Sequence, residues 1–496
     1  MATFEGNVCP YCNQTRSTTT RSAIATISLA EKTSHIQREV QRVEDLITKL
    51  HHQRSVLLQH LNEIQSPISI LPPETLSVVF QYASPKPRFE EVSQFIAPRQ
   101  FTLGAVSVLW RQTLLSTPSL WAAVELDILP NMMDKRSSLL RAFLIHSGDL
   151  PLSIGLRYHN PTASHHTREP EFLISPTVDP ILYENAHRIR GLHLSKAHSP
   201  WINYIPHLTN LVDLTLSIQS ALNRTPSDLI LDNVPCSQLI LSSFRARVQL
   251  YWSAITILHL SLIPIDVSLE LLVKCTNLLE YKVVSPIQAA ASGAAFAIPN
   301  YIFVLPRLEV FQWVVDLHRP IDIAMLRFIQ MPALRRLVWV TANTHAAIPG
   351  IPESAKVFFD RLPMTLTTLE IRSTHVWTDG SVFDHLHDEL RIENLVISSC
   401  VGDFPRHVLR RLSSSGGGSM RLPQLKSISF VGTQGEQALI VDVLEHRFLH
   451  GTQSFRLEFK YCTTPWLSKF REKAKELVDD GLKLEVIVDE RSMDLT

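Results

Sequence analysis

The chain of 496 residues carries two hydrophobic patterns, one with the period of a helix and one with the period of a strand. Between residues 23 and 65, apolar residues recur in steps of three and four without a proline or glycine. This is a heptad pattern sustained over about five heptads, and it predicts one long amphipathic helix. Its seam consists of Leu29, Ile36, Val40, Val43, Ile47, Leu50, Leu57, Leu61 and Ile64, with Thr33 and Arg54 at the two remaining positions.

A helix with such a seam needs a partner for its apolar side. The partner is either a second copy, which would give a homodimer through residues 29–64, or the rest of the same chain. The pattern alone leaves both alternatives open. The segment before it, residues 1–22, is polar and rich in Thr and Ser, and we predict that it is disordered.

Two shorter helices are predicted after the long one. Ser66 and Pro67 end the long helix, because proline disfavours helical geometry in the residue before it. Pro72 and Pro73 then supply a fixed φ at a new helix start, and Glu74 suits the positive end of the helix dipole. A further helical pattern covers residues 102–115, with Val106, Leu109, Trp110 and Leu114 on one side.

The stretches "ILPPETLSVVF" and "LGAVSVLWRQTLLSTPSLW" resemble an F-box, the small helical module of cullin–RING ubiquitin ligase receptors, and place it at residues 66–122. The wider context resembles the large F-box family of mushroom-forming fungi. The chain departs from the family pattern in a long segment between the helices and in Ser107, where Cys is usual. The resemblance implies docking on the Skp adaptor, and through it on cullin, by Leu71, Pro72, Pro73, Leu76, Val79, Phe80 and Trp110.

The second pattern begins near residue 189 and repeats at intervals of 19 to 33 residues. Each unit ends in two apolar residues two positions apart, which is the period of a strand with one buried face. The last apolar positions are Leu194, Leu216, Leu241, Leu260, Val283, Trp313, Trp339, Ile371, Ile397, Phe430 and Phe459. The pattern resembles irregular leucine-rich repeats, which implies an α/β solenoid over residues 123–490 with a parallel sheet on its concave face and helices such as 265–277 and 321–331 outside. Residues 491–496 would form a tail.

Residues that alternate with the apolar positions should face away from this core. We predict that they form a substrate-binding strip on the concave face, because an open sheet face with several valines suits protein binding. The strip comprises Gln312, Val314, Val338, Val340, Glu370, Arg372, Val396 and Ser398. The alternative is that loops or the C-terminal tail cover these residues.

Composition narrows the class of protein further. Lys plus Arg equals Asp plus Glu, 47 each, which argues against nucleic acid or an anionic membrane as the main partner. No apolar run reaches the roughly 18 residues of a spanning helix, no secretory signal is evident, and six scattered cysteines suit a reducing compartment. A cytoplasmic or nuclear location is therefore expected.

No constellation of residues predicts catalysis, a cofactor or a metal site. Cys9 and Cys12 form one C-x-x-C pair, but structural zinc needs four ligands and no second pair follows at suitable spacing. The leading interpretation is therefore a non-enzymatic substrate-recognition subunit of an SCF-type ubiquitin ligase. The alternative is a leucine-rich-repeat interaction scaffold that the N-terminal helix dimerises.

Overall fold

The computed structural model describes residues 29–65, 67–84, 99–128, 133–158, 178–196, 205–217, 229–231, 234–243, 248–287, 301–315, 326–341, 353–373, 383, 386, 389–400, 403–413, 421–433, 435–462, 468–489 and 491–492. The predicted disordered segment and the Cys9–Cys12 pair lie outside these residues. The chain divides into two compact units, Met1–Val79 with Leu103–Thr113 and Phe80–Thr102 with Leu114–Thr496.

The predicted long helix is present as α1 (Leu29–Gln65), and it ends where Pro67 was expected to end it. Every described side chain of α1, from residue 31 to residue 61, is exposed. The chain continues through η1 (Pro67–Ile70), α2 (Pro73–Ala83), α3 (Arg99–Gly104), α4 (Val108–Leu115) and η2 (Pro118–Leu120).

The start of α2 agrees with the role predicted for the two prolines. Pro73 is its first residue, and the carbonyl of Pro72 accepts a hydrogen bond from the backbone N–H of Leu76 at 3.0 Å. The second helical pattern was predicted to form one helix, but the structure divides it into α3 and α4. Ser107 explains the division, because its hydroxyl accepts a hydrogen bond from the backbone N–H of Trp110 at 3.1 Å and so caps α4. Val106 therefore precedes α4 and is exposed.

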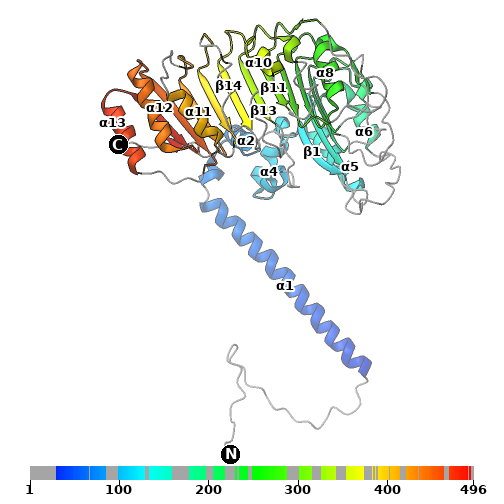
Figure 1. Ribbon diagram of the computed structural model, residues 1–496. Helices are drawn as coiled ribbons and strands as arrows, with labels where there is room; N and C mark the ends of the chain where they lie inside the picture. The colour runs from blue at the N-terminus through cyan, green and yellow to red at the C-terminus, as the bar shows by residue number, and fades with distance from the viewer. Residues whose placement is uncertain are drawn as a thin grey trace, which may run out of the picture. The chain divides into compact units, whose positions relative to one another are not determined.

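The second unit is built on a sheet of fourteen parallel strands, β1 to β18, with an antiparallel fifteenth strand at one edge. The sheet is open and its strands follow one another along the chain (Figure 1). The strands are β1 (Ala123–Ile128), β2 (Leu152–Tyr158), β3 (Ile189–Ser195), β4 (Asp213–Ser217), β6 (Gln238–Ser242), β8 (Ile257–Ser261), β9 (Glu280–Val284), β11 (Val310–Val315), β13 (Arg336–Thr341), β14 (Thr368–Ser373), β15 (Asn394–Ser398), β16 (Ser427–Val431), β17 (Ser454–Lys460), β18 (Lys483–Val488) and β19 (Arg491–Ser492).

The apolar positions predicted to repeat along the chain are in register across this sheet. Leu194 pairs with Leu216, which pairs with Leu241, and the alignment continues to Leu260 and Val283. A second run aligns Trp313, Trp339, Ile371, Ile397, Phe430 and Phe459. All of them are buried, so the strand positions predicted from the sequence are confirmed.

Helices cover the face of the sheet on which these residues lie. They are α5 (Met133–His146), α6 (Asp179–Glu184), α8 (Ile265–Lys274), α10 (Glu353–Phe359), α11 (Phe404–Ser413), α12 (Gln437–Leu449) and α13 (Ser468–Asp479). The hydroxyl of Tyr281 on β9 donates to the carbonyl of Ser268 on α8 at 2.7 Å, and Trp339 on β13 packs against Phe359 on α10 at a ring distance of 4.8 Å. The core therefore lies between the sheet and its helices.

One prediction about local structure is wrong. The segment 321–331 was expected to be a helix, but its described part forms the short turn η7 (Leu326–Phe328) and β12 (Ile329–Gln330). β12 pairs with β10 (Phe303–Val304) in a separate small sheet, which satisfies its backbone without a helix. A second small sheet pairs β5 (Leu229–Leu231) with β7 (Val248–Leu250). Within residues 491–496, which were expected to form a tail, β19 pairs with β18.

A left-handed residue follows many of the strands directly. Ser243, Leu262, Ser285, Ser399 and Tyr461 each have a φ between 46° and 56° and come immediately after β6, β8, β9, β15 and β17. The backbone N–H of Ser399 donates to the carbonyl of Val431 on the next strand, and that of Leu262 donates to Val284 in the same way. The turn therefore repeats with the strands, although the residue type at this position does not.

The described residues thus form a mixed α/β protein with a long N-terminal helix and an open parallel sheet.

Candidate functional site

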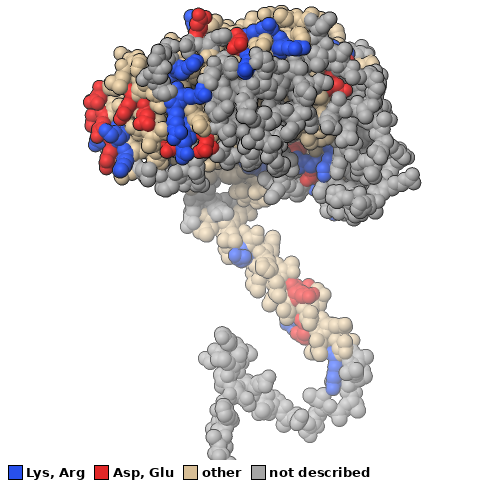
Figure 2. All heavy atoms as spheres, viewed as in Figure 1, with Lys and Arg blue, Asp and Glu red and all other residues tan. Residues whose placement is uncertain are grey.

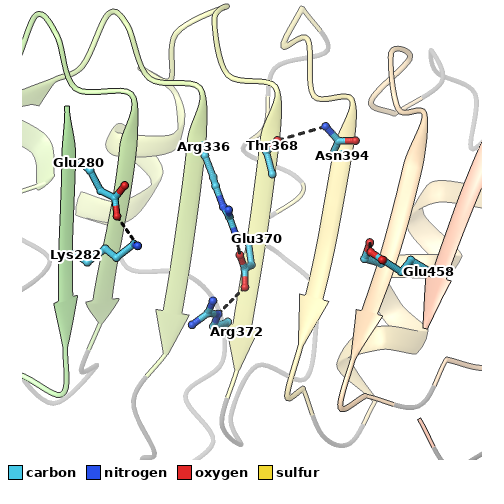
Figure 3. Close-up of polar contacts among 9 residues, drawn as sticks. Glu280, Lys282, Arg336, Thr368, Glu370, Arg372, Asn394 and Glu458 are labelled. Carbon is cyan, nitrogen blue, oxygen red and sulfur yellow. Dashed lines mark hydrogen bonds and ion pairs between the residues drawn. The ribbon is translucent and has the colours of Figure 1, made fainter. Parts of the chain in front are cut away.

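The sheet has a second face, opposite the core, on which polar and charged side chains gather. Figure 3 shows this polar face between β9 and β17, with the helices behind the strands. Its residues alternate with the buried core positions, so both sets follow from the period of two in a strand. The eight residues of the predicted substrate-binding strip all lie on this face.

Strand register places the eight predicted residues in two parallel rows. One row aligns Gln312, Val338, Glu370 and Val396, and the next row aligns Val314, Val340, Arg372 and Ser398. Sequence reasoning therefore grouped residues that the structure also brings together, although they come from four strands spread over 87 residues of chain.

The side chains in these two rows are less exposed to solvent than the predicted open binding strip requires. Gln312, Val314, Val338, Glu370 and Ser398 are buried. Val340, Arg372 and Val396 are partly exposed. A binding partner could therefore reach Val340, Arg372 and Val396 without any change in the fold, whereas the other five residues are already covered by other parts of the chain.

The strongest polar cluster on this face is centred on Glu370. One oxygen of its carboxylate accepts a hydrogen bond from the Arg336 guanidinium at 2.6 Å, and the other accepts one from Arg372 at 2.6 Å (Figure 3). Burial disfavours the charged carboxylate, but the hydrogen bonds and charges of the two arginines outweigh it and hold the pKa of Glu370 below its usual value. The cluster is therefore an ion triad whose carboxylate is buried and whose cations are partly exposed.

A second cluster joins β8 to β9. One carboxylate oxygen of Glu280 lies 2.7 Å from Nε2 of His259 and also accepts from the Lys282 ammonium. The hydrogen bond to His259 is the main reason that the pKa of Glu280 falls to about 2, against an opposing effect of burial. Glu280 therefore stays charged at any ordinary pH.

A third cluster on β16 and β17 repeats this arrangement. The hydroxyl of Ser429 donates to Glu458 at 2.9 Å, and the ammonium of Lys460 lies 3.1 Å from the same carboxylate. Burial opposes ionisation of Glu458, but Ser429, Lys460 and Arg456 together lower its pKa. The polar face thus carries, at three places along the sheet, a glutamate that pairs with at least one lysine or arginine.

Sequence reasoning left most of these partners out of the predicted site. Glu280, Lys282, Arg336 and Glu458 were not among the predicted residues, although a signal for them exists. Three strands carry Glu and a cation two positions later, as in Glu280–Lys282, Glu370–Arg372 and Glu458–Lys460. Residues two apart on a strand share a face, so this spacing indicates ion pairs on the non-core side.

The residues predicted to dock on an adaptor differ in exposure. Pro72, Pro73 and Val79 are exposed, and Leu71 and Trp110 are partly exposed. Leu76 and Phe80 are fully buried, so they belong to the interior of the protein.

α2 nevertheless presents a second apolar side. Val78 and Tyr82 are 48% and 85% exposed and lie four positions apart on the side opposite Leu76 and Phe80, and Val79, which is 45% exposed, lies at the edge between the two sides. Large apolar side chains that are exposed together on one helix are typical of a surface that binds another protein.

The part of the chain that the structure describes offers no group of His, Cys, Asp or Glu able to hold a metal ion. None of the described helices is long and apolar enough to span a membrane. In the view of Figure 2, basic and acidic side chains are interspersed on the described surface.

Comparison with models of known protein families and with curated proteins gave no match for this chain.

Proposed function

We propose that the protein is the substrate-recognition subunit of an SCF-type ubiquitin ligase. In this proposal residues 66–122 form an F-box that binds the Skp adaptor, and the sheet unit is a leucine-rich-repeat solenoid that binds a substrate protein. The observation that carries it is the two-sided apolar character of α2, which buries Leu76 and Phe80 on one side, exposes Val78 and Tyr82 on the other, and exposes Val79 at the edge between them. A helix with no further partner would carry polar residues on that second side.

The proposed mechanism is proximity. Binding to the sheet unit would hold the substrate near the catalytic end of the ligase and so raise the effective concentration of its lysines. The chain itself would supply no reacting group. On the polar face, the substrate would contact Val340, Arg372 and Val396, because these members of the predicted strip are partly exposed.

Co-purification with the Skp adaptor tests the docking step. The full-length chain carries the affinity tag, and two variants are compared with wild type, Leu71→Ala/Pro72→Ala and Val78→Ser/Tyr82→Ser. The matched control is Leu449→Ser/Tyr461→Ser, which removes two apolar side chains that are each 81% exposed and lie outside α2. All of these chains should fold, because the substituted residues are exposed or partly exposed.

Wild type and the control should retain the adaptor, whereas Leu71→Ala/Pro72→Ala and Val78→Ser/Tyr82→Ser should each lose most of it. If folded wild type does not retain the adaptor, the ligase proposal fails. If both of these variants bind as well as the control does, the adaptor docks neither on α2 nor on the residues directly before it.

The alternative function is a non-catalytic interaction scaffold. The specific observation in its favour is α1, whose apolar seam is exposed along its described length. Failure of adaptor binding together with a stable homodimer would favour the scaffold.

A further inference from the structure

The exposed apolar seam of α1 is long enough to specify how two copies would pair. The seam positions fall into the two core positions of a heptad, a and d. Thr33, Val40, Ile47, Arg54 and Leu61 occupy position a. Leu29, Ile36, Val43, Leu50, Leu57 and Ile64 occupy position d.

A parallel pairing in register places like charges together. Residues at the same position face each other in a parallel dimer, so Arg54 would lie opposite Arg54 of the second copy inside the seam. Glu39 at position g would also lie beside Glu44 of the second copy at position e. Both contacts are repulsive, which disfavours this orientation.

An antiparallel pairing removes both conflicts. Position a of one helix then faces position d of the other, and every pair whose residue numbers add to 97 is matched: Thr33 with Ile64, Val40 with Leu57, Ile47 with Leu50, Arg54 with Val43 and Leu61 with Ile36. In this register Arg54 lies beside Glu44 of the second copy, because Glu44 follows Val43 at the edge of the seam. Shifting the register by one heptad in either direction places Gln37 or His51 there instead and shortens the overlap.

The charges outside the seam leave this register free to form. Arg42 pairs with Glu39 at 3.9 Å within the same helix, and Gln41 donates to Asp45 at 3.0 Å on the outer surface. Between residues 50 and 61, Arg54 is the one Lys, Arg, Asp or Glu. A lone arginine at position a therefore acts as the element that selects orientation.

We propose that α1 forms an antiparallel homodimeric coiled coil centred between Thr48 and Lys49, with Arg54 of each copy paired with Glu44 of the other. At a rise of about 1.5 Å per residue, the two Gln65 ends lie roughly 50 Å apart. The two sheet units of the dimer then follow from opposite ends of the coiled coil. The proposal does not depend on adaptor docking, because none of its residues lies in α2 or α4.

Cysteine cross-linking in the full-length chain distinguishes the orientations. The background carries Cys9→Ser and Cys12→Ser, and two proteins are made from it, Val40→Cys and Leu57→Cys. A mixture of the two should cross-link through a short bismaleimide, because residues 40 and 57 face each other in the antiparallel register. Each protein alone should not, because identical positions then lie about 25 Å apart.

Efficient cross-linking of Val40→Cys alone would show a parallel dimer and overturn the proposal. The absence of any cross-link, together with the mass of one chain by light scattering, would show that α1 does not dimerise and would also overturn it.

A charge exchange tests the specific pair. Arg54→Glu should raise the dimer dissociation constant about tenfold, and the double variant Glu44→Arg/Arg54→Glu should restore it. Arg38→Glu is the matched control, since position 38 points away from the seam, and it should leave dimerisation unchanged. If Arg54→Glu dimerises as wild type does, or if the double variant is weaker than the single one, the ion pair is wrong.

Discussion

Replacing Glu370 by Gln removes the buried carboxylate that joins two arginines on the polar face. The substitution keeps the shape of the side chain and removes its charge. One amide oxygen still accepts a hydrogen bond, whereas the amide nitrogen is a donor that faces a second donor on Arg336 or Arg372. The change therefore isolates the charge of Glu370 from its packing.

The expected loss follows from the burial of the three partners. A hydrogen bond to a charged group contributes about 1.5–3 kcal/mol when buried, and an exposed ion pair contributes about 0–1 kcal/mol. Glu370 is buried, but the side chains of Arg336 and Arg372 are 49% and 40% exposed, so each pair belongs between these limits. Because Gln retains one of the two bonds, we expect a loss of about 1–2 kcal/mol.

Amide hydrogen exchange followed by mass spectrometry measures this loss where it occurs. In an array of repeated strands, local opening is measured more directly than a single global unfolding transition. The amides of β13 and β14 should lose protection by a factor of about 5–30 at pH 7. β3 and β4 should be unchanged, because they are distant along the sheet.

Glu309→Gln, at the residue directly before β11, is the matched control. Glu309 lies 3.9 Å from Arg335 and both side chains are at least half exposed, so its loss should stay within about 0.5 kcal/mol. Equal protection of β13 and β14 in Glu370→Gln and wild type at pH 7 would refute the reasoning.

The pH dependence provides a second check. The pKa of Glu370 is lower in the folded protein than in the unfolded chain, so its contribution is present above the unfolded pKa and is lost as pH falls through the folded pKa. The difference between wild type and variant should therefore shrink as pH falls below about 4.5. A difference that is independent of pH would show that packing, and not charge, caused it.

Two further substitutions test a partly exposed histidine and a buried aromatic ring. Nδ1 of His193 lies 2.9 Å from the Thr215 hydroxyl, and burial lowers the pKa of His193 to about 4. Wild type should therefore lose stability as pH falls from about 6.5 to 4, and His193→Gln should lose less stability over that range. Thermal melts across the range measure this difference, and parallel stability curves for the two proteins would contradict it. Phe430→Ala removes a buried ring that stacks on Phe459 at 5.3 Å and should cost about 3–5 kcal/mol, seen as lost exchange protection in β16 and β17; a loss below about 1 kcal/mol would show that the site collapses around the cavity.

Much of the fold follows from hydrophobic period alone. The long helix and the strand positions from Leu194 to Phe459 were predicted because an amphipathic helix and a strand with one buried face each leave a regular period in the sequence. The end of the helix followed instead from Pro67. The same period assigned the correct face to residues such as Gln312 and Arg372.

The folded structure decided the features that depend on particular hydrogen bonds, whether these are local or join distant segments. Ser107 divides the second helical pattern because its hydroxyl caps α4, and the segment 326–330 forms a turn and a short strand because β10 lies beside it. Neither result is visible in residue period.

The polar face shows the same division most clearly. Sequence placed Glu370 on the non-core side, because side chains alternate along a strand. Only the sheet register brought Arg336 within 2.6 Å of it, across 34 residues of chain. Glu370 is buried, whereas Val340 and Arg372 are partly exposed. The strand pattern does not predict this difference, because burial on this face depends on what lies in front of the sheet.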